Sequence, residues 1–93
     1  MAVIVRIPTP LRRLTNGQEK VEVSEGSLES IIDSLEQSFS GIKGRLCDDQ
    51  GGFRTFVNIY INFEDVRFLE GINTPVKDGD EISIVPAVAG GKN

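Results

Sequence analysis

The sequence predicts an α+β domain in which a mixed sheet of four to five strands packs against one main helix. Three observations support this fold. Two alternating segments near the N-terminus are joined by a turn, a single apolar stripe at helical spacing follows them, and further alternating segments come after that stripe. A hairpin, one crossover helix and more strands are typical of a single mixed sheet with the helix on one face.

The first predicted element is a hairpin. Residues 3–7 alternate between Val or Ile and other side chains until Pro8 ends the run. Residues 11–17 form the predicted turn, because the Asn-Gly pair at its end is a strong turn signal. Residues 20–23 alternate again, so we expect them to pair with the first strand.

The main helix is predicted over residues 28–39. Its apolar residues fall on one face: Leu28, Ile31, Ile32, Leu35 and Phe39. Ser27 is the expected N-cap and Gly41 the expected C-terminal stop. A further short turn of helix is predicted over residues 42–46, before a loop at residues 48–52.

The third strand, residues 57–62, shows the clearest alternation. Its apolar residues are Val57, Ile59 and Ile61, and its other face holds Asn58, Tyr60 and Asn62. The polar face is either a partner-binding surface or a merely solvated one. A short strand is predicted over residues 66–68, and a tight turn at residues 77–80 precedes a last strand over residues 81–85.

The chain is therefore expected to form one domain over residues 1–85, followed by a C-terminal tail over residues 86–93. Pro86 is expected to end the last strand, and small residues follow it up to Gly90 and Gly91. A chain of 93 residues is long enough for one core without a metal or a disulfide.

The composition argues against several classes of function. A net charge of -4 does not favour nucleic-acid binding, which needs a clustered basic face. The absence of histidine removes the commonest general base and metal ligand, so we expect no catalytic residue and no metal. Cys47 is single, which excludes an internal disulfide and an iron-sulfur site of the four-cysteine ferredoxin type. The neighbouring Asp48 and Asp49 are expected to raise its pKa, so we interpret it as incidental.

The expected location is the cytoplasm. No signal peptide is recognisable at the N-terminus, and no stretch approaches the roughly 20 apolar residues that span a bilayer. We therefore expect no membrane partner.

Four segments resemble the MoaD/ThiS family of ubiquitin-like sulfur carriers. They are Phe56–Asn62, Glu64–Phe68, Val76–Ile82 and the tail Pro86–Gly91. Within the family the likeness is greatest to carriers of the CysO type, which deliver sulfur for cysteine synthesis. The resemblance implies a β-grasp fold and a carrier without a cofactor of its own.

The resemblance also implies the chemistry of the tail. An E1-like enzyme would adenylate Gly91 and convert it to a thiocarboxylate, after Val88, Ala89, Gly90 and Gly91 thread into the partner. The acceptor would be a cysteine synthase that uses pyridoxal phosphate. Many carriers end at the second glycine, whereas Lys92 and Asn93 follow here. A zinc metalloprotease of the JAMM type would then cut between Gly91 and Lys92, unless the two residues are a cloning remnant.

Alternatives remain open at this stage. Sulfur delivery to molybdopterin or thiamine synthesis would use the same tail. A protein modifier would instead join Gly91 to lysines of other proteins, and a plain interaction module would not use the tail at all.

Overall fold

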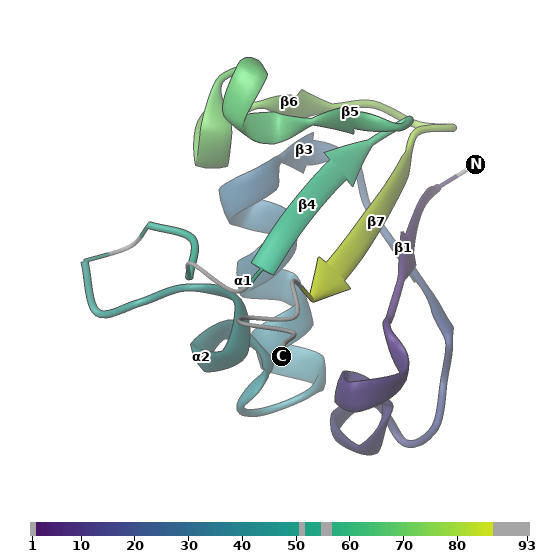
Figure 1. The fold of residues 1–93 in the computed structure, drawn as a ribbon. Coiled ribbons are helices and arrows are strands. Elements are labelled where there is room, and N and C mark those ends of the chain that lie inside the picture. Colours follow the sequence, from purple (N-terminus) through teal and green to yellow (C-terminus); the bar gives the residue numbers. More distant parts are fainter. Residues whose placement is uncertain (1, 51, 55–56, 87–93) are drawn as a thin grey trace.

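The computed structural model describes residues 2–50, 52–54 and 57–86 of the chain. Figure 1 shows a twisted sheet with helix α1 (Leu28–Ser38) packed across one face. The sheet has the order β2-β1-β7-β4-β5, and its strands are β1 (Val3–Arg6), β2 (Lys20–Val23), β4 (Val57–Ile61), β5 (Glu64–Asp65) and β7 (Glu81–Pro86). Strands β1 and β7 are parallel and the other neighbours are antiparallel, which confirms the mixed sheet.

The N-terminal hairpin is confirmed, but its connection is larger than a simple turn. Strands β1 and β2 pair antiparallel. Between them the chain forms a 3-10 helix, η1 (Thr9–Thr15), which ends at Asn16 in the left-handed conformation with φ 57°. The buried Thr15 accounts for this compact connection, because its hydroxyl lies 2.8 Å from the carbonyl oxygen of Gln18 and donates to it.

Helix α1 begins as predicted. The Ser27 hydroxyl accepts a hydrogen bond of 3.2 Å from the backbone N–H of Ser30, which is the expected N-cap. The helix ends at Ser38, so Phe39 is its C-cap rather than its last residue. Gly41, with φ 99°, is the N-cap of helix α2 (Ile42–Leu46). This helix confirms the short second helical turn that the sequence predicts.

The predicted strand at residues 66–68 is wrong. Those residues form a 3-10 helix, η2 (Val66–Phe68), and the short strand β5 lies just before it. The Asp65 carboxylate accepts a hydrogen bond of 2.8 Å from the N–H of Arg67, and this cap starts the helix. A strand would place Val66 and Phe68 on one face, whereas Val66 is buried and Phe68 is 84% exposed.

A second, two-stranded sheet was not predicted. Strand β3 (Gly26–Ser27) pairs antiparallel with β6 (Pro75–Val76), after the 3-10 helix η3 (Gly71–Asn73). This pair holds the N-terminus of α1 against the segment that precedes β7, and Thr74 O accepts a hydrogen bond of 2.9 Å from the N–H of Leu28.

The core lies between α1 and the inner face of the sheet. The predicted inward residues of β1, β4 and β7 are buried, as is the helical stripe: Val3, Val5, Ile7, Leu28, Ile31, Ile32, Leu35, Val57, Ile59, Ile61, Ile82 and Ile84. Phe39 is only partly buried at the edge of this core. In the described part of the chain no helix is long and apolar enough to cross a membrane.

Candidate functional site

The candidate site begins where the described chain ends, at Pro86. The predicted tail residues Val88, Ala89, Gly90 and Gly91 and the predicted processing residue Lys92 lie outside the described residues. Strand β7 includes Pro86, one residue beyond the predicted end of the last strand, and Pro86 lies opposite Val57 of β4. Strand β7 pairs with β1 only over residues 81–83, whereas its pairing with β4 continues to Pro86, so the tail starts from a strand end that β4 holds.

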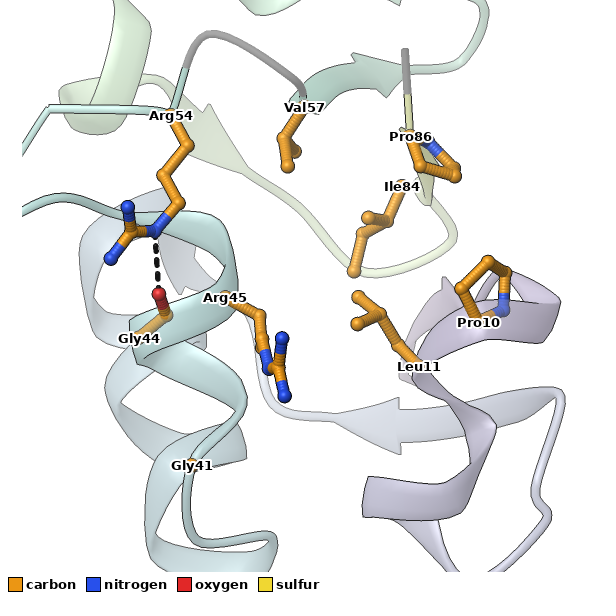
Figure 2. A pocket seen from close by; sticks show the side chains of 9 residues that line it. All are labelled: Pro10, Leu11, Gly41, Gly44, Arg45, Arg54, Val57, Ile84 and Pro86. Carbon is orange, nitrogen blue, oxygen red and sulfur yellow. Dashed lines mark hydrogen bonds between the residues drawn. The ribbon is translucent and has the colours of Figure 1, made fainter. Parts of the chain in front are cut away.

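A hollow of about 650 Å³ adjoins this strand end. Its walls come from η1, α2 and the adjacent ends of β4 and β7, and Figure 2 shows how they surround it. The apolar side consists of Leu11, Val57, Ile84 and the two prolines Pro10 and Pro86. Segments far apart in the sequence therefore form one concave surface beside the start of the tail.

The opposite side of the hollow is basic. Arg45 extends from α2 into the space between α2 and η1, while Arg54 lies beside α2 (Figure 2). Arg54 Nε donates a hydrogen bond of 2.6 Å to the carbonyl oxygen of Gly44, which fixes that guanidinium. Within the described residues, Arg45 makes no hydrogen bond or ion pair through its side chain. Two arginines thus line the same hollow as Pro86, the last described residue, in a chain whose net charge is -4.

The polar face of β4 is only partly as predicted. Asn58 and Tyr60 are half-buried on the outer face, and the Asn58 amide oxygen accepts a hydrogen bond from Arg67 Nη1 at 2.5 Å. Asn62 is not on this face, because β4 ends at Ile61 and Asn62 begins a turn with φ 52°. The exposed Val85 lies opposite Asn58 in register, so this face reaches the strand end that leads to the tail.

Cys47 is part of the core rather than of a site. Its side chain is buried, and burial is the main cause that raises the pKa of its thiol, with a smaller contribution from the Asp48 charge. The prediction of a raised pKa is thus confirmed, although burial raises it more than the Asp48 charge on which the prediction relied. Asp48 itself turns toward its own loop, where its Oδ1 accepts hydrogen bonds from the N–H groups of Gln50 at 2.8 Å and Gly52 at 3.1 Å.

The two arginines of the hollow were not found by sequence analysis. They lie on either side of the loop at residues 48–52, and only the folding of that loop brings Arg54 back beside Gly44. No spacing rule in the sequence indicates this approach. Among the described residues no group of three or more carboxylate or cysteine side chains is placed to hold a metal ion.

The comparisons with known proteins identify the family of the chain. The model of the ThiS family matches residues 5–91, which include the Gly-Gly pair. The sulfur carrier protein CysO of Mycobacterium tuberculosis is 50% identical over 93 residues, covering 98% of this chain and 100% of that protein. The small archaeal modifier protein 3 of Haloferax volcanii is 37% identical over 67 residues, covering 72% of each chain.

The fold has a close counterpart among solved structures. A chain in the crystal structure of the Amycolatopsis orientalis BexX/CysO complex superposes with a TM-score of 0.90 at 47% identity, covering 96% of this chain and 99% of that one. The fold is therefore the β-grasp fold that the resemblance implied. The family match spans nearly the whole chain, from β1 through the sheet to the second glycine of the tail. The chain belongs to the ThiS family of ubiquitin-like proteins.

Proposed function

We propose that this protein is a sulfur carrier whose working group is the carboxylate of Gly91, and that the sulfur goes to cysteine biosynthesis. The observation that supports this most is the position of the tail. The central strand β7 ends at Pro86 and leads directly to Ala87–Gly91, the segment that closes on the Gly-Gly pair. The 50% identity to a protein named sulfur carrier CysO supports cysteine synthesis over other acceptors.

The chemistry requires activation, because a carboxylate is a poor electrophile. An E1-like enzyme would use ATP to join AMP to the Gly91 carboxylate and release pyrophosphate. Hydrosulfide would then attack the acyl carbon and displace AMP, which leaves the thiocarboxylate. If a persulfide of the partner attacks instead, the product is an acyl disulfide; a second thiol of the partner would cleave its S–S bond, releasing the thiocarboxylate and leaving a disulfide on the partner. In this scheme the carrier is a substrate of its partners, and ATP, zinc and pyridoxal phosphate belong to those partners.

Partner enzymes would handle the rest of the cycle. A JAMM-type zinc metalloprotease would first hydrolyse the bond between Gly91 and Lys92, since the thiocarboxylate needs a free C-terminal glycine. A cysteine synthase that uses pyridoxal phosphate would then accept the sulfur. The complex of a related CysO with BexX supports the general idea that such carriers dock on a second protein. We place these steps in the cytoplasm.

This chain contributes a tail long enough to enter a partner and a strand that anchors the tail. Six residues from Pro86 to Gly91 extend up to about 20 Å at roughly 3.3 Å each, far enough to enter a buried active site. Glycine has no Cβ, so Gly90 and Gly91 can pass a narrow channel that larger residues would block. Pairing with β4 up to Pro86 anchors the start of the tail to the folded body.

Intact-mass analysis of the protein from its native cell tests the proposal. We expect a species that has lost Lys92 and Asn93 and has one oxygen of Gly91 replaced by sulfur. Growth on labelled sulfate should place the label on this species and then in newly made cysteine. A chain that keeps Asn93 and no added sulfur under every growth condition would rule out the carrier function.

A protein modifier is the second candidate, and the likeness to the small archaeal modifier protein 3 favours it. In that case Gly91 would be found in isopeptide linkage to lysines of other proteins. Peptide mapping of high-mass species separates the two functions, because a carrier leaves no such linkage. If the label went to molybdopterin or thiamine instead of cysteine, the carrier function would stand and only its sulfur acceptor would differ.

A further inference from the structure

The hollow beside Pro86 combines apolar walls with two arginines, and the proposed carrier function does not yet use it. We propose that this hollow is the resting site of the chain's own processed tail, with the Gly91 carboxylate or thiocarboxylate bound by Arg45 and Arg54. The inference rests on the proposed function in one respect, because it needs a free acidic group at Gly91.

The first argument is distance along the chain. Pro86 is itself part of the wall, so the tail begins at the rim of the hollow. Five further residues reach Gly91 and span at most about 17 Å at roughly 3.3 Å each. A short connection from a fixed strand end has a small closure entropy, so binding to this site competes well with free motion.

The second argument is the shape and polarity of the walls. Leu11, Val57 and Ile84 form an apolar side, which suits Val88, the one bulky apolar residue between Ala87 and Gly91. On the other side the backbone lies open at Gly44, where an added Cβ would meet no atom within 4 Å. The Gly-Gly pair of the tail can approach such a surface closely because it has no side chains.

The third argument is charge. Arg54 uses Nε to bind the Gly44 carbonyl, which leaves the two Nη groups of its guanidinium for another acceptor. Arg45 enters the hollow with no side-chain partner among the described residues. A guanidinium is suited to bind a carboxylate with two donors at once, and the thiocarboxylate has the same negative charge.

The arrangement would protect the sulfur between enzymes. A thiocarboxylate held against the body is less exposed to oxidants and electrophiles than one on a free chain end. A partner enzyme must then displace the tail before it can use it, so the arginines would set how readily the loaded tail leaves. An acidic segment of a partner and a small anion are the other possible occupants of the same charges.

Solution NMR on two forms of the processed chain tests the site. One form ends in the Gly91 carboxylate and the other in the Gly91 carboxamide, which differ only in the charge at the tail. We expect the carboxylate form to shift the backbone amide signals of Gly41, Gly44 and Arg45 and the Nε–H signal of Arg45. We also expect order parameters for residues 87–91 above about 0.6, the range below which backbone is flexible.

Substitutions identify the binding groups. Arg45→Gln with Arg54→Gln should abolish the difference between the two forms, whereas Arg13→Gln should retain it. Arg13 is the matched control because it is exposed, lies outside the hollow and has no ion pair among the described residues. About 1 M salt should also reduce the difference, because it shortens the Debye length to about 3 Å.

The outcomes separate this inference from the proposed function. The resting site would be overturned if the amide signals of Gly41, Gly44 and Arg45 were identical in the carboxylate and carboxamide forms. So would shifts caused by added phosphate or an acidic peptide when the tail itself causes none. Adenylation of Gly91 is measured on the carboxylate form, because the carboxamide has no carboxylate to activate. An empty hollow with normal adenylation refutes the resting site alone, and an occupied hollow without adenylation refutes the carrier function alone.

Discussion

The side-chain amide of Asn62 donates a hydrogen bond of 2.9 Å to Oδ1 of Asp80, and this bond ties the turn after β4 to the turn before β7. The other carboxylate oxygen of Asp80 accepts a bond of 2.9 Å from the N–H of Lys77. Both bonds lower the pKa of Asp80 from its ordinary value, and the bond from Lys77 has the larger effect. Two turns at the far end of the sheet from the tail therefore depend on one ionised carboxylate.

Acid should weaken this link. A carboxylate whose pKa is lowered by folding stabilises the protein above its ordinary pKa of about 3.9, and this stabilisation is lost as the pH falls through the lowered value. Asp80→Asn should therefore lower the free energy of unfolding near neutral pH, and the difference from the native chain should shrink as the pH falls below the ordinary carboxyl pKa of about 3.9. Urea unfolding at a series of pH values measures both effects.

A control removes the same charge elsewhere. Asp49→Asn is suitable because Asp49 is exposed and its carboxylate makes no hydrogen bond or ion pair within the described residues. If Asp49→Asn reproduced the pH dependence of Asp80→Asn, net charge and not the Asn62–Asp80 link would explain the effect.

Phe63 is strained, and we expect Phe63→Gly to stabilise the protein by about 0.5–1 kcal/mol. Asn62 and Phe63 join β4 to β5 with φ values of 52° and 75°, a conformation that favours Asn and Gly and disfavours a bulky side chain. Phe63 is also 87% exposed, so the substitution removes little packing. Thermal or urea unfolding provides the measurement.

Phe68→Gly is the matched control for the strain. Phe68 is 84% exposed but has no positive φ, so glycine there only adds freedom to the unfolded chain. This variant should lose stability. A gain of equal size in both variants would show that exposure of the aromatic ring, and not the backbone, is responsible. No structural contact in the described residues explains why Phe stands at position 63.

Cys47 should react slowly in the native protein. Cys47 is 4% exposed and burial raises the pKa of its thiol, so both access and thiolate content are low. Alkylation by iodoacetamide at mildly alkaline pH should be at least about a hundredfold slower than in urea, because it requires local opening. Mass spectrometry of the alkylated chain measures this, and rapid native labelling would contradict the placement of Cys47 in the core.

The slow reaction has a practical consequence for the carrier. In the native state a thiocarboxylate at Gly91 should be alkylated much faster than Cys47, although the proposed resting site would slow its reaction. Cys47→Ala provides the control, because a label that persists in this variant must lie on another atom. The loss of the native label in this variant would show that Cys47 had reacted instead.

The fold follows from the sequence wherever one local pattern and burial agree. The stripe of α1 and the alternation of β4 both indicate which residues face inward, and Leu35 and Ile59 are buried as predicted. The prediction at residues 66–68 is wrong because two apolar residues with one residue between them also fit a short strand. The Asp65 cap, which the alternation of apolar residues does not reveal, decides in favour of a 3-10 helix.

The surroundings of the tail were harder to predict than the tail itself. The Gly-Gly pair is a linear motif, so the sequence alone can locate it. The hollow is built from η1, α2, β4 and β7, and its members approach one another only in the folded chain. Arg45 is an ordinary exposed residue of a short helix in the sequence, and its position opposite Leu11 depends on how α2 packs.

Deletion of Gly90 and Gly91 should abolish adenylation and leave the fold intact. The last described strand ends at Pro86, and the last core residue in the sequence is Ile84, so removal of the glycines takes away no buried side chain. In a chain that ends at residue 91, Gly91→Ala should lower the rate of adenylation about a hundredfold or more, because a small misplacement of the reacting group has effects of that size. ATP–pyrophosphate exchange with the activating enzyme measures the rate, and the unfolding midpoint checks the fold.

Ala89→Gly is the matched control, because it changes one Cβ just outside the glycine pair. It should adenylate at close to the native rate. Equal losses in Ala89→Gly and Gly91→Ala would indicate a general sensitivity of the tail to its composition. Adenylation that survived deletion of both glycines would place the activated carboxylate elsewhere, and the tail would then have no part in the chemistry.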